Sequence, residues 1–222
     1  TVPHKEGVLS LLDRLAPEAQ AVGAVNTLVA EGGRWVGHNT DIEGVRAALA
    51  AAGCAIQGQR VLVLGAGGAA RAAAYALLSG GAAVRVLARR PAQAEHLAQA
   101  LGRWFPPGQV EAGPLNPAAL PDEAAEVDGL VQATPVGLWP RVEGSLWPDS
   151  AGLPARLWVF DLVYRPLRTR LLRQATDAGG KTVDGVGMLV HQGAAAFRLW
   201  TGVEPPLKVM AQACLEAWEP KE

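Results

Sequence analysis

Short runs of apolar residues, each followed by a turn and a helical stretch, recur through the middle of the chain. The first run, 60–64 (RVLVL), leads into a cluster of glycines and then an alanine-rich stretch that reaches Leu78. A second run covers 83–87, and Pro91 then begins a pattern with apolar residues at helical spacing. This order predicts a strand, a helix, a second strand and a second helix.

Further strand candidates follow at regular intervals, each separated from the next by turn residues or a helical stretch. They are 109–112, 129–133, 158–162 and 181–183. Alternation of this kind predicts an α/β fold, with a mostly parallel sheet covered by helices on both faces.

The two ends of the chain carry different patterns. The first part predicts an amphipathic helix near 6–15, strands at 24–30 and 35–37 joined as a hairpin, a helix at 41–52 and a linker at 53–58. The last part predicts two helices, at 188–199 and 209–218. We therefore expect a smaller domain at 1–55, a larger one at 56–186, and C-terminal helices at 187–222 that return to the first.

Composition and charge narrow the range of partners. The 222 residues carry 20 basic and 21 acidic side chains without a dense basic run, so neither nucleic acid nor an anionic membrane is an expected partner. The longest apolar stretch, 47–56, is shorter than the roughly 18 residues that a membrane-spanning helix needs. Cys54 and Cys214 are far apart and lack metal-ligand spacing, which favours a reducing cytoplasm and predicts no metal site. A small-molecule ligand is the expected partner.

The glycine cluster after the first strand is a candidate phosphate site. Gly65, Gly67 and Gly68 would let a pyrophosphate approach the backbone, where a helix N-terminus offers free N–H groups. Ala70 occupies the third position of the dinucleotide-binding fingerprint, where a small residue allows close packing of helix and strand. The alternative interpretation is a glycine-rich turn that binds no ligand.

The end of the second strand indicates which dinucleotide this site would bind. An NAD site usually has an acidic residue there, whereas this chain has Arg89 and Arg90. Guanidinium groups pair with phosphate oxygens, so NADP is favoured over NAD. Arg71 would add charge near the phosphates. The alternative is that the two arginines are only a solvated strand end.

Several motifs together resemble those of the shikimate dehydrogenase family, and they follow the family's order over nearly the whole chain. They are TVPHK at 1–5, GAVNT at 23–27, NTD at 39–41, GAGGAAR at 65–71, DLVYRP at 161–166 and DGVGMLVHQGAAAFRLWTG at 184–202. The resemblance implies a Rossmann-type doubly wound sheet beside a smaller α/β substrate domain.

The chain departs from the family's pattern at three places. Ala88 and Arg90 stand where the family usually has Asn and a hydroxyl residue, and Gln132 stands where it usually has Asn. The family's Ser-x-Ser motif, which holds the substrate carboxylate, would precede Thr1. We therefore expect that the chain begins inside a longer protein, that its substrate domain is N-terminally incomplete, and that it binds NADP but turns over shikimate poorly.

The resemblance also implies roles for individual residues. Lys5 would donate the proton, and Asp41 would hold the Lys5 side chain in place and orient the substrate. The implied substrate-binding residues are Thr1, Asn26, Asp41, Tyr164 and Gln192. The implied cofactor-binding residues are Gly65, Ala66, Gly67, Gly68, Ala69, Arg89, Arg90, Thr134, Leu162, Gly185 and Met188.

The implied reaction is the NADP-dependent reduction of 3-dehydroshikimate to shikimate, a step of aromatic amino-acid and chorismate biosynthesis, in a cytoplasmic monomer or homodimer. One alternative is a quinate/shikimate dehydrogenase with a changed substrate preference. Others are a non-catalytic NADP-binding protein and an inactive fragment of the enzyme.

Overall fold

The computed structural model describes residues 4–217, which form a large parallel sheet and a small mixed sheet. The large sheet has the strand order β6-β5-β4-β7-β8-β9, and every neighbouring pair is parallel. Its strands are β4 (Arg60–Leu64), β5 (Ala83–Ala88), β6 (Val110–Pro114), β7 (Gly129–Gln132), β8 (Trp158–Asp161) and β9 (Thr182–Val183). The strand order reverses between β4 and β7, and this is the point where such sheets bind ligands. The predicted α/β fold is confirmed.

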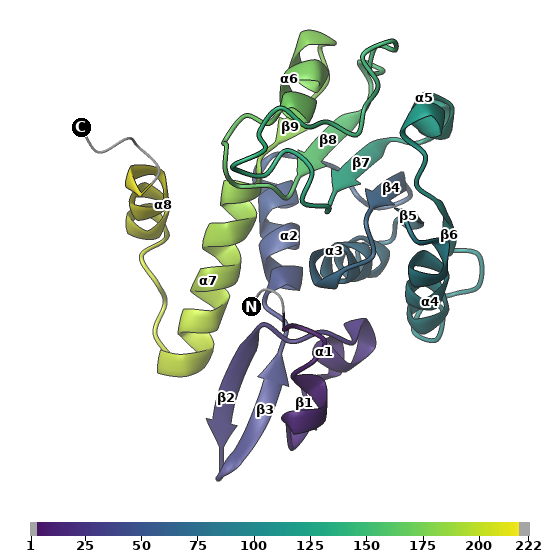
Figure 1. Cartoon of the computed structure of the whole chain (residues 1–222). Helices are drawn as coiled ribbons and strands as arrows, with labels where there is room; N and C mark the ends of the chain where they lie inside the picture. The colour runs from purple at the N-terminus through teal and green to yellow at the C-terminus, as the bar shows by residue number, and fades with distance from the viewer. Residues whose placement is uncertain (1–3, 218–222) are drawn as a thin grey trace.

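A hydrophobic core lies on each face of this sheet, and the alternating side chains of the central strand β4 contribute to both. In β4, Val61 and Val63 belong to one buried cluster while Leu62 and Leu64 belong to the other. The first cluster includes residues of α2 (Asp41–Ala51), α3 (Gly68–Ser79) and α4 (Pro91–Leu101). The second includes residues of α5 (Leu120–Glu123) and α6 (Arg170–Asp177). The sheet is therefore covered on both faces, as Figure 1 shows.

The small sheet lies at the opposite end of the molecule from α5 and α6 (Figure 1). Its strands are β1 (Arg14–Leu15), β2 (Thr27–Glu31) and β3 (Arg34–His38), in the order β1-β3-β2. Gly32 and Gly33 have φ of 56° and 78°, the left-handed values that a two-residue turn between antiparallel strands requires. The predicted hairpin is confirmed.

The helix predicted near 6–15 is wrong. The segment forms turns, a 3-10 turn η1 (Leu9–Leu11) and β1, and a helix that the sequence did not indicate, α1 (Pro17–Val22), follows. None of residues 4–16 is buried, and Leu11 is 77% exposed. The apolar positions of 6–15 therefore make no buried stripe, and burial of such a stripe is what stabilises a short helix. Proline at the first position of α1 suits a helix start instead.

One of the two C-terminal helices, the longer one, packs back onto the first part of the chain. The two helices are α7 (Gly185–Thr201) and α8 (Leu207–Glu216), and α7 contacts α2, β2 and α8. A Cβ atom at Gly44 of α2 would lie 2.7 Å from the Met188 carbonyl oxygen of α7, so glycine permits this close approach. Two further 3-10 turns, η2 (Pro117–Ala119) and η3 (Ala124–Glu126), flank α5.

Candidate functional site

The glycine turn after β4 has the backbone geometry that a phosphate site requires. Gly65 has φ of +113°, and a Cβ atom there would lie 2.9 Å from the Ala133 carbonyl oxygen, so only glycine fits. Gly67 is the N-cap of α3, and a Cβ atom there would meet nothing within 4 Å. The backbone of this turn is therefore open to a ligand at the N-terminus of a helix.

A cavity of about 300 Å³ lies beside this turn. It is lined by six predicted cofactor residues: Gly65, Ala66, Gly67, Arg89, Arg90 and Thr134. Both arginines are exposed where β5 ends, and neither side chain has an ion-pair partner within residues 4–217. Free guanidinium groups beside a glycine turn suit a phosphate group. We call this space the cofactor cavity.

A second cavity, of about 180 Å³, adjoins the first turn of α3 at Ala69, and we call it the catalytic cavity. It is lined by Lys5, Asp41, Ala69, Leu162, Tyr164, Gly185, Met188, Leu189 and Gln192. Four predicted cofactor residues, Ala69, Leu162, Gly185 and Met188, therefore share a cavity with the predicted catalytic pair. Gly68 also lies next to Lys5, because a Cβ atom there would lie 2.9 Å from Lys5 Cδ.

Lys5 and Asp41 form an ion pair at the catalytic cavity, and their side chains are 14% and 5% exposed. His4 and Lys5 lie in a turn rather than at the end of a strand, and the Lys5 carbonyl accepts a hydrogen bond of 2.8 Å from the Val25 N–H. Asp41 is the first residue of α2, and its N–H donates to Asn39 Oδ1 over 3.1 Å. Its carboxylate at a helix N-terminus is favoured by the helix dipole.

Asn26 connects this ion pair to the neighbouring polar groups. Its Nδ2 donates over 2.9 Å to Asp41 Oδ1 and to Thr40 Oγ1, and lies 3.4 Å from Gln192 Oε1. Its Oδ1 accepts from the Thr40 N–H and the Thr27 hydroxyl over 2.8 and 3.1 Å. The Asn26 side chain is thus hydrogen-bonded within the protein, and it links Asp41 to Gln192, which both line the catalytic cavity.

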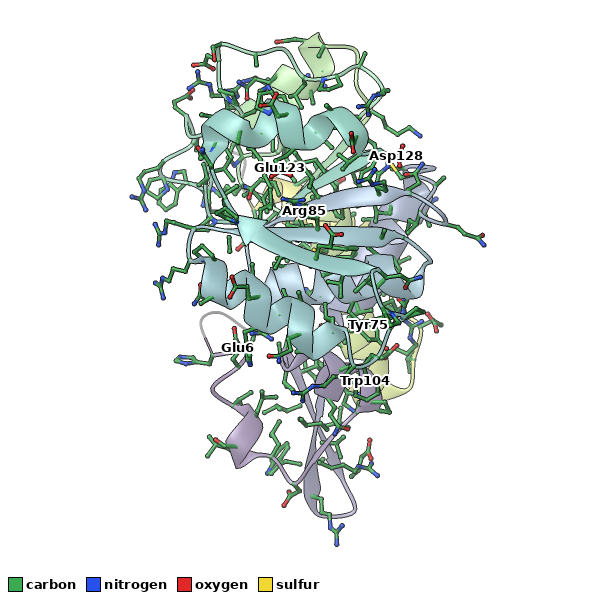
Figure 2. All side chains as sticks on the ribbon, turned by 90° about the vertical axis from the view of Figure 1, so that its right-hand side faces the viewer. Glu6, Tyr75, Arg85, Trp104, Glu123 and Asp128 are labelled. Atoms are coloured by element: carbon green, nitrogen blue, oxygen red, sulfur yellow. The ribbon has the colours of Figure 1, made fainter. Side chains whose placement is uncertain are left out.

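The sequence also suggested roles for Thr1 and Arg71. Thr1, implied as a substrate contact, lies outside the described residues. Arg71 does not lie near the glycine turn's ligand face as the sequence suggested: its side chain is 9% exposed, and it donates over 3.3 Å to the Val22 carbonyl and pairs with Glu6 over 3.5 Å. Glu6 lies on the N-terminal segment (Figure 2). Arg71 therefore ties α3 to the turn that carries Lys5.

Sequence reasoning missed a buried polar group at the ends of β7 and β8. Asp161 is fully buried, accepts from Thr169 Oγ1 and the Val163 N–H over 2.6 and 3.0 Å, and lies 3.4 Å from Gln132 Nε2. Burial raises the pKa of Asp161 to about 6, and the hydrogen bonds from Thr169 and Val163 oppose that rise. An acidic residue closing an otherwise apolar strand (WVFD) was the available signal.

The described residues offer neither a metal-binding cluster nor a membrane-spanning helix. Within 4–217, no cluster of three or more His, Cys, Asp or Glu is arranged to hold a metal ion. No helix in that range has both the length and the apolar character to cross a membrane.

These features define a class of protein. They are those of a Rossmann-type nucleotide-dependent oxidoreductase. The sheet is parallel and doubly wound, with a glycine turn at its switch point and two arginines at the next strand end that have no ion-pair partner among residues 4–217. An adjoining cavity holds a lysine–aspartate pair.

Comparisons with known proteins give the family. A model of the shikimate dehydrogenase substrate-binding domain matches residues 1–28, and one of the shikimate 5'-dehydrogenase C-terminal domain matches 185–215. The shikimate dehydrogenase (NADP(+)) of Symbiobacterium thermophilum is 44% identical over 220 residues, which are 99% of this chain and 75% of that protein.

Two solved structures extend this comparison. Shikimate 5-dehydrogenase from Thermus thermophilus, solved with NADP(H) and shikimate, is 44% identical with a TM-score of 0.85, and the match covers 98% of this chain and 77% of that one. Quinate dehydrogenase from Corynebacterium glutamicum, solved with NAD, is 36% identical with a TM-score of 0.88, covering 97% and 76%.

The chain belongs to the shikimate dehydrogenase family. The predicted family is therefore confirmed. At the level of the family, the relatives also confirm the predicted class of enzyme, an NADP-dependent oxidoreductase that acts on a CH–OH group.

Proposed function

We propose that this chain catalyses the NADP-dependent interconversion of 3-dehydroshikimate and shikimate, with Lys5 as the proton donor. One observation carries the proposal: the Lys5–Asp41 ion pair lines a cavity that also touches Ala69, in the first turn of the helix that begins at the glycine loop. A group able to give a proton and a turn able to bind a dinucleotide are thus adjacent.

The residues present fit NADP. The space that a Cβ atom would fill at Gly67 is open, and Gly65 is held in a conformation that other residues rarely adopt. The glycine turn would hold the pyrophosphate, while Arg89 and Arg90 would pair with the 2′-phosphate. Met188, Leu162 and Gly185 would line the nicotinamide at the boundary with the catalytic cavity.

The chain's own residues provide the acid–base chemistry. When bound, NADPH supplies a hydride to the carbonyl carbon, so the carbonyl oxygen must gain a proton. Lys5 Nζ holds such a proton at the cavity wall, and the Asp41 carboxylate fixes the position of Nζ. In the reverse direction, Lys5 would accept the proton of the substrate hydroxyl.

Neutral polar groups would recognise the substrate hydroxyls. Gln192 and Tyr164 line the catalytic cavity, and Asn26 lies within reach of the Gln192 side chain. Such groups pair with hydroxyls without adding net charge. Shikimate is favoured over quinate as the substrate, because relatives 44% and 48% identical to this chain are shikimate dehydrogenases, whereas the quinate dehydrogenase is 36% identical.

The test is a set of assays of the purified chain with shikimate or quinate and with NADP+ or NAD+. We expect kcat/KM to be highest for shikimate with NADP+. A preference for quinate or for NAD+ would overturn the corresponding part of the proposal, and NADP+ binding without oxidation of either acid would favour a non-catalytic NADP-binding protein.

Some predictions of the sequence remain predictions. They are the domain bounds 1–55, 56–186 and 187–222, the cytoplasmic location, the monomeric or homodimeric state, and weak turnover by this chain. The predicted boundary between 1–55 and 56–186 does not separate two hydrophobic cores, because residues of α2 and of β4 share one buried cluster.

A further inference from the structure

Two buried side chains end the neighbouring strands β7 and β8, each beside a loop that lines one of the two cavities. Gln132 and Asp161 are paired in the register of the parallel sheet, and they are 1% and 0% exposed. Neither lines the cofactor cavity or the catalytic cavity. Their effect on a bound molecule would therefore pass through the loops that they hold.

Gln132 holds the loop that follows β7. Its Nε2 donates to the carbonyls of Thr134 and Val136 over 3.2 and 3.0 Å, and its Oε1 accepts from the Thr134 N–H over 2.5 Å. Thr134, Pro135 and Val136 form one wall of the cofactor cavity. One amide side chain thus fixes the backbone of that wall.

Asp161 holds the loop that follows β8. Its Oδ1 accepts from the Val163 N–H, between two residues that line the catalytic cavity, Leu162 and Tyr164. Its Oδ2 accepts from the hydroxyl of Thr169, the N-cap of α6. A Cβ atom at Gly185 would lie 2.7 Å from the carbonyl oxygens of Leu162 and Val163, so a shift of this loop would also move against the start of α7.

The two loops are joined to each other. Gln132 Nε2 lies 3.4 Å from Asp161 Oδ1, and farther along the loops the Trp139 N–H donates to the Arg165 carbonyl over 2.9 Å. The Arg165 guanidinium also lies 4.6 Å from the centre of the Trp139 ring. Displacement of either loop therefore strains the other.

We propose that Gln132 and Asp161 are positioning residues that set the walls of both cavities together, although they touch neither ligand. This inference rests on the proposed function for the identity of the two ligands. A change at either residue would weaken the binding of NADP and of shikimate at once, and it would leave the Lys5–Asp41 ion pair in place.

The experiment compares Gln132→Leu and Asp161→Asn with Val159→Ala. Val159 is a buried residue of β8 two positions before Asp161, so its truncation weakens the core without removing a loop hydrogen bond. For each variant we would measure the melting temperature, the Kd for NADP+ by calorimetry, and KM and kcat for shikimate.

We expect the Kd for NADP+ and the KM for shikimate to rise about tenfold in both loop variants, the effect of about one unpaired buried hydrogen bond. kcat at saturation would fall far less, and Val159→Ala would lower the melting temperature with little change in Kd. Loop variants whose Kd and KM match those of Val159→Ala would overturn the proposal. Because the Kd for NADP+ needs no turnover, a wild-type chain that does not oxidise shikimate would count against the proposed substrate and leave this comparison decisive.

Discussion

The cofactor cavity and the catalytic cavity both adjoin the N-terminus of α3, and their charged residues are assembled in different ways. The glycine turn, Arg89 and Arg90 come from a single strand–helix–strand unit, although residues 133–136 after β7 also line this cavity. The two arginines have no ion-pair partner in the part of the chain that the structure describes. The catalytic cavity gathers Lys5, Asp41 and Gln192 from distant parts of the chain, and its lysine is paired with a carboxylate.

The two cavities are therefore suited to different tasks. Unpaired positive charge suits binding of an anionic group, because the guanidinium groups give up no partner when a phosphate arrives. A paired and hydrogen-bonded lysine suits chemistry, because its position is fixed before the substrate enters. Changes in the catalytic cavity should therefore alter turnover, and changes in the cofactor cavity should alter the affinity for NADP+.

The largest expected effect tests the catalytic side. Lys5→Met removes the proton donor and should lower kcat by about 10² to 10⁴, the usual contribution of a positioned general acid. The Kd for NADP+, measured by calorimetry, should stay near the wild-type value. Lys208→Met, at an exposed position of α8, is the matched control. Near-normal kcat in Lys5→Met would show that Lys5 is not the proton donor.

A second test concerns Asp161, which ends β8 and holds a loop that lines the catalytic cavity. Its pKa is raised by burial from 3.8 to about 6 in the folded protein, so the folded state resists ionisation there. Its contribution to stability is fully present below pH 4 and is lost as pH rises to about 6, a change on the order of 3 kcal/mol.

Asp161→Asn should flatten this part of the pH dependence. The measurement is the free energy of unfolding by urea from pH 4 to pH 7 in both proteins. Asp128→Asn, at an exposed carboxyl, serves as the control. If the two variants gave the same pH dependence as the wild type, Asp161 would not titrate as described.

The cofactor side is tested by replacing Arg89 and Arg90 together with alanine. Loss of charge-assisted hydrogen bonds to a phosphate costs about 1.5 to 3 kcal/mol, so the Kd for NADP+ should rise roughly tenfold to hundredfold. The Kd for NAD+ and kcat at saturating NADP+ should change little. Arg103→Ala is the control, since Arg103 is exposed and outside the cofactor cavity. Equal losses for the two cofactors would contradict recognition of a 2′-phosphate.

The smallest expected effect separates binding from stability within the glycine turn. At Gly67 φ is −80° and a Cβ atom would meet nothing, so Gly67→Ala should leave the melting temperature unchanged while weakening NADP+ binding about tenfold. At Gly65, alanine would be strained by the positive φ and would clash with the Ala133 carbonyl. Gly65→Ala should therefore lower both the melting temperature and the affinity for NADP+. Unchanged affinity in Gly67→Ala would place the pyrophosphate elsewhere.

The same contrast explains what the sequence could predict. The strand over 60–64 and the glycine turn were predicted correctly, because a buried parallel strand and a close backbone approach leave local signatures in apolar runs and glycines. The helix predicted near 6–15 failed because apolar spacing does not report whether a stripe is buried.

The contacts of the catalytic cavity could not be predicted from local sequence patterns. Lys5 and Asp41 are 36 residues apart, and their meeting was implied by the resemblance alone. The Asn26 hydrogen bonds and the Gln132–Asp161 pair were missed because they depend on which strand ends are neighbours in the folded sheet. That order follows from packing of the whole chain rather than from any one segment.

The most direct test of the account is a single-turnover reaction, with the chain in excess over 3-dehydroshikimate and with saturating NADPH, so that a slow reaction is also detected. We expect one NADPH to be consumed for each shikimate formed, and we expect the rate to fall by about 10² to 10⁴ in Lys5→Met although NADPH stays bound. No shikimate from the wild-type chain, or an equal rate in the variant, would contradict it.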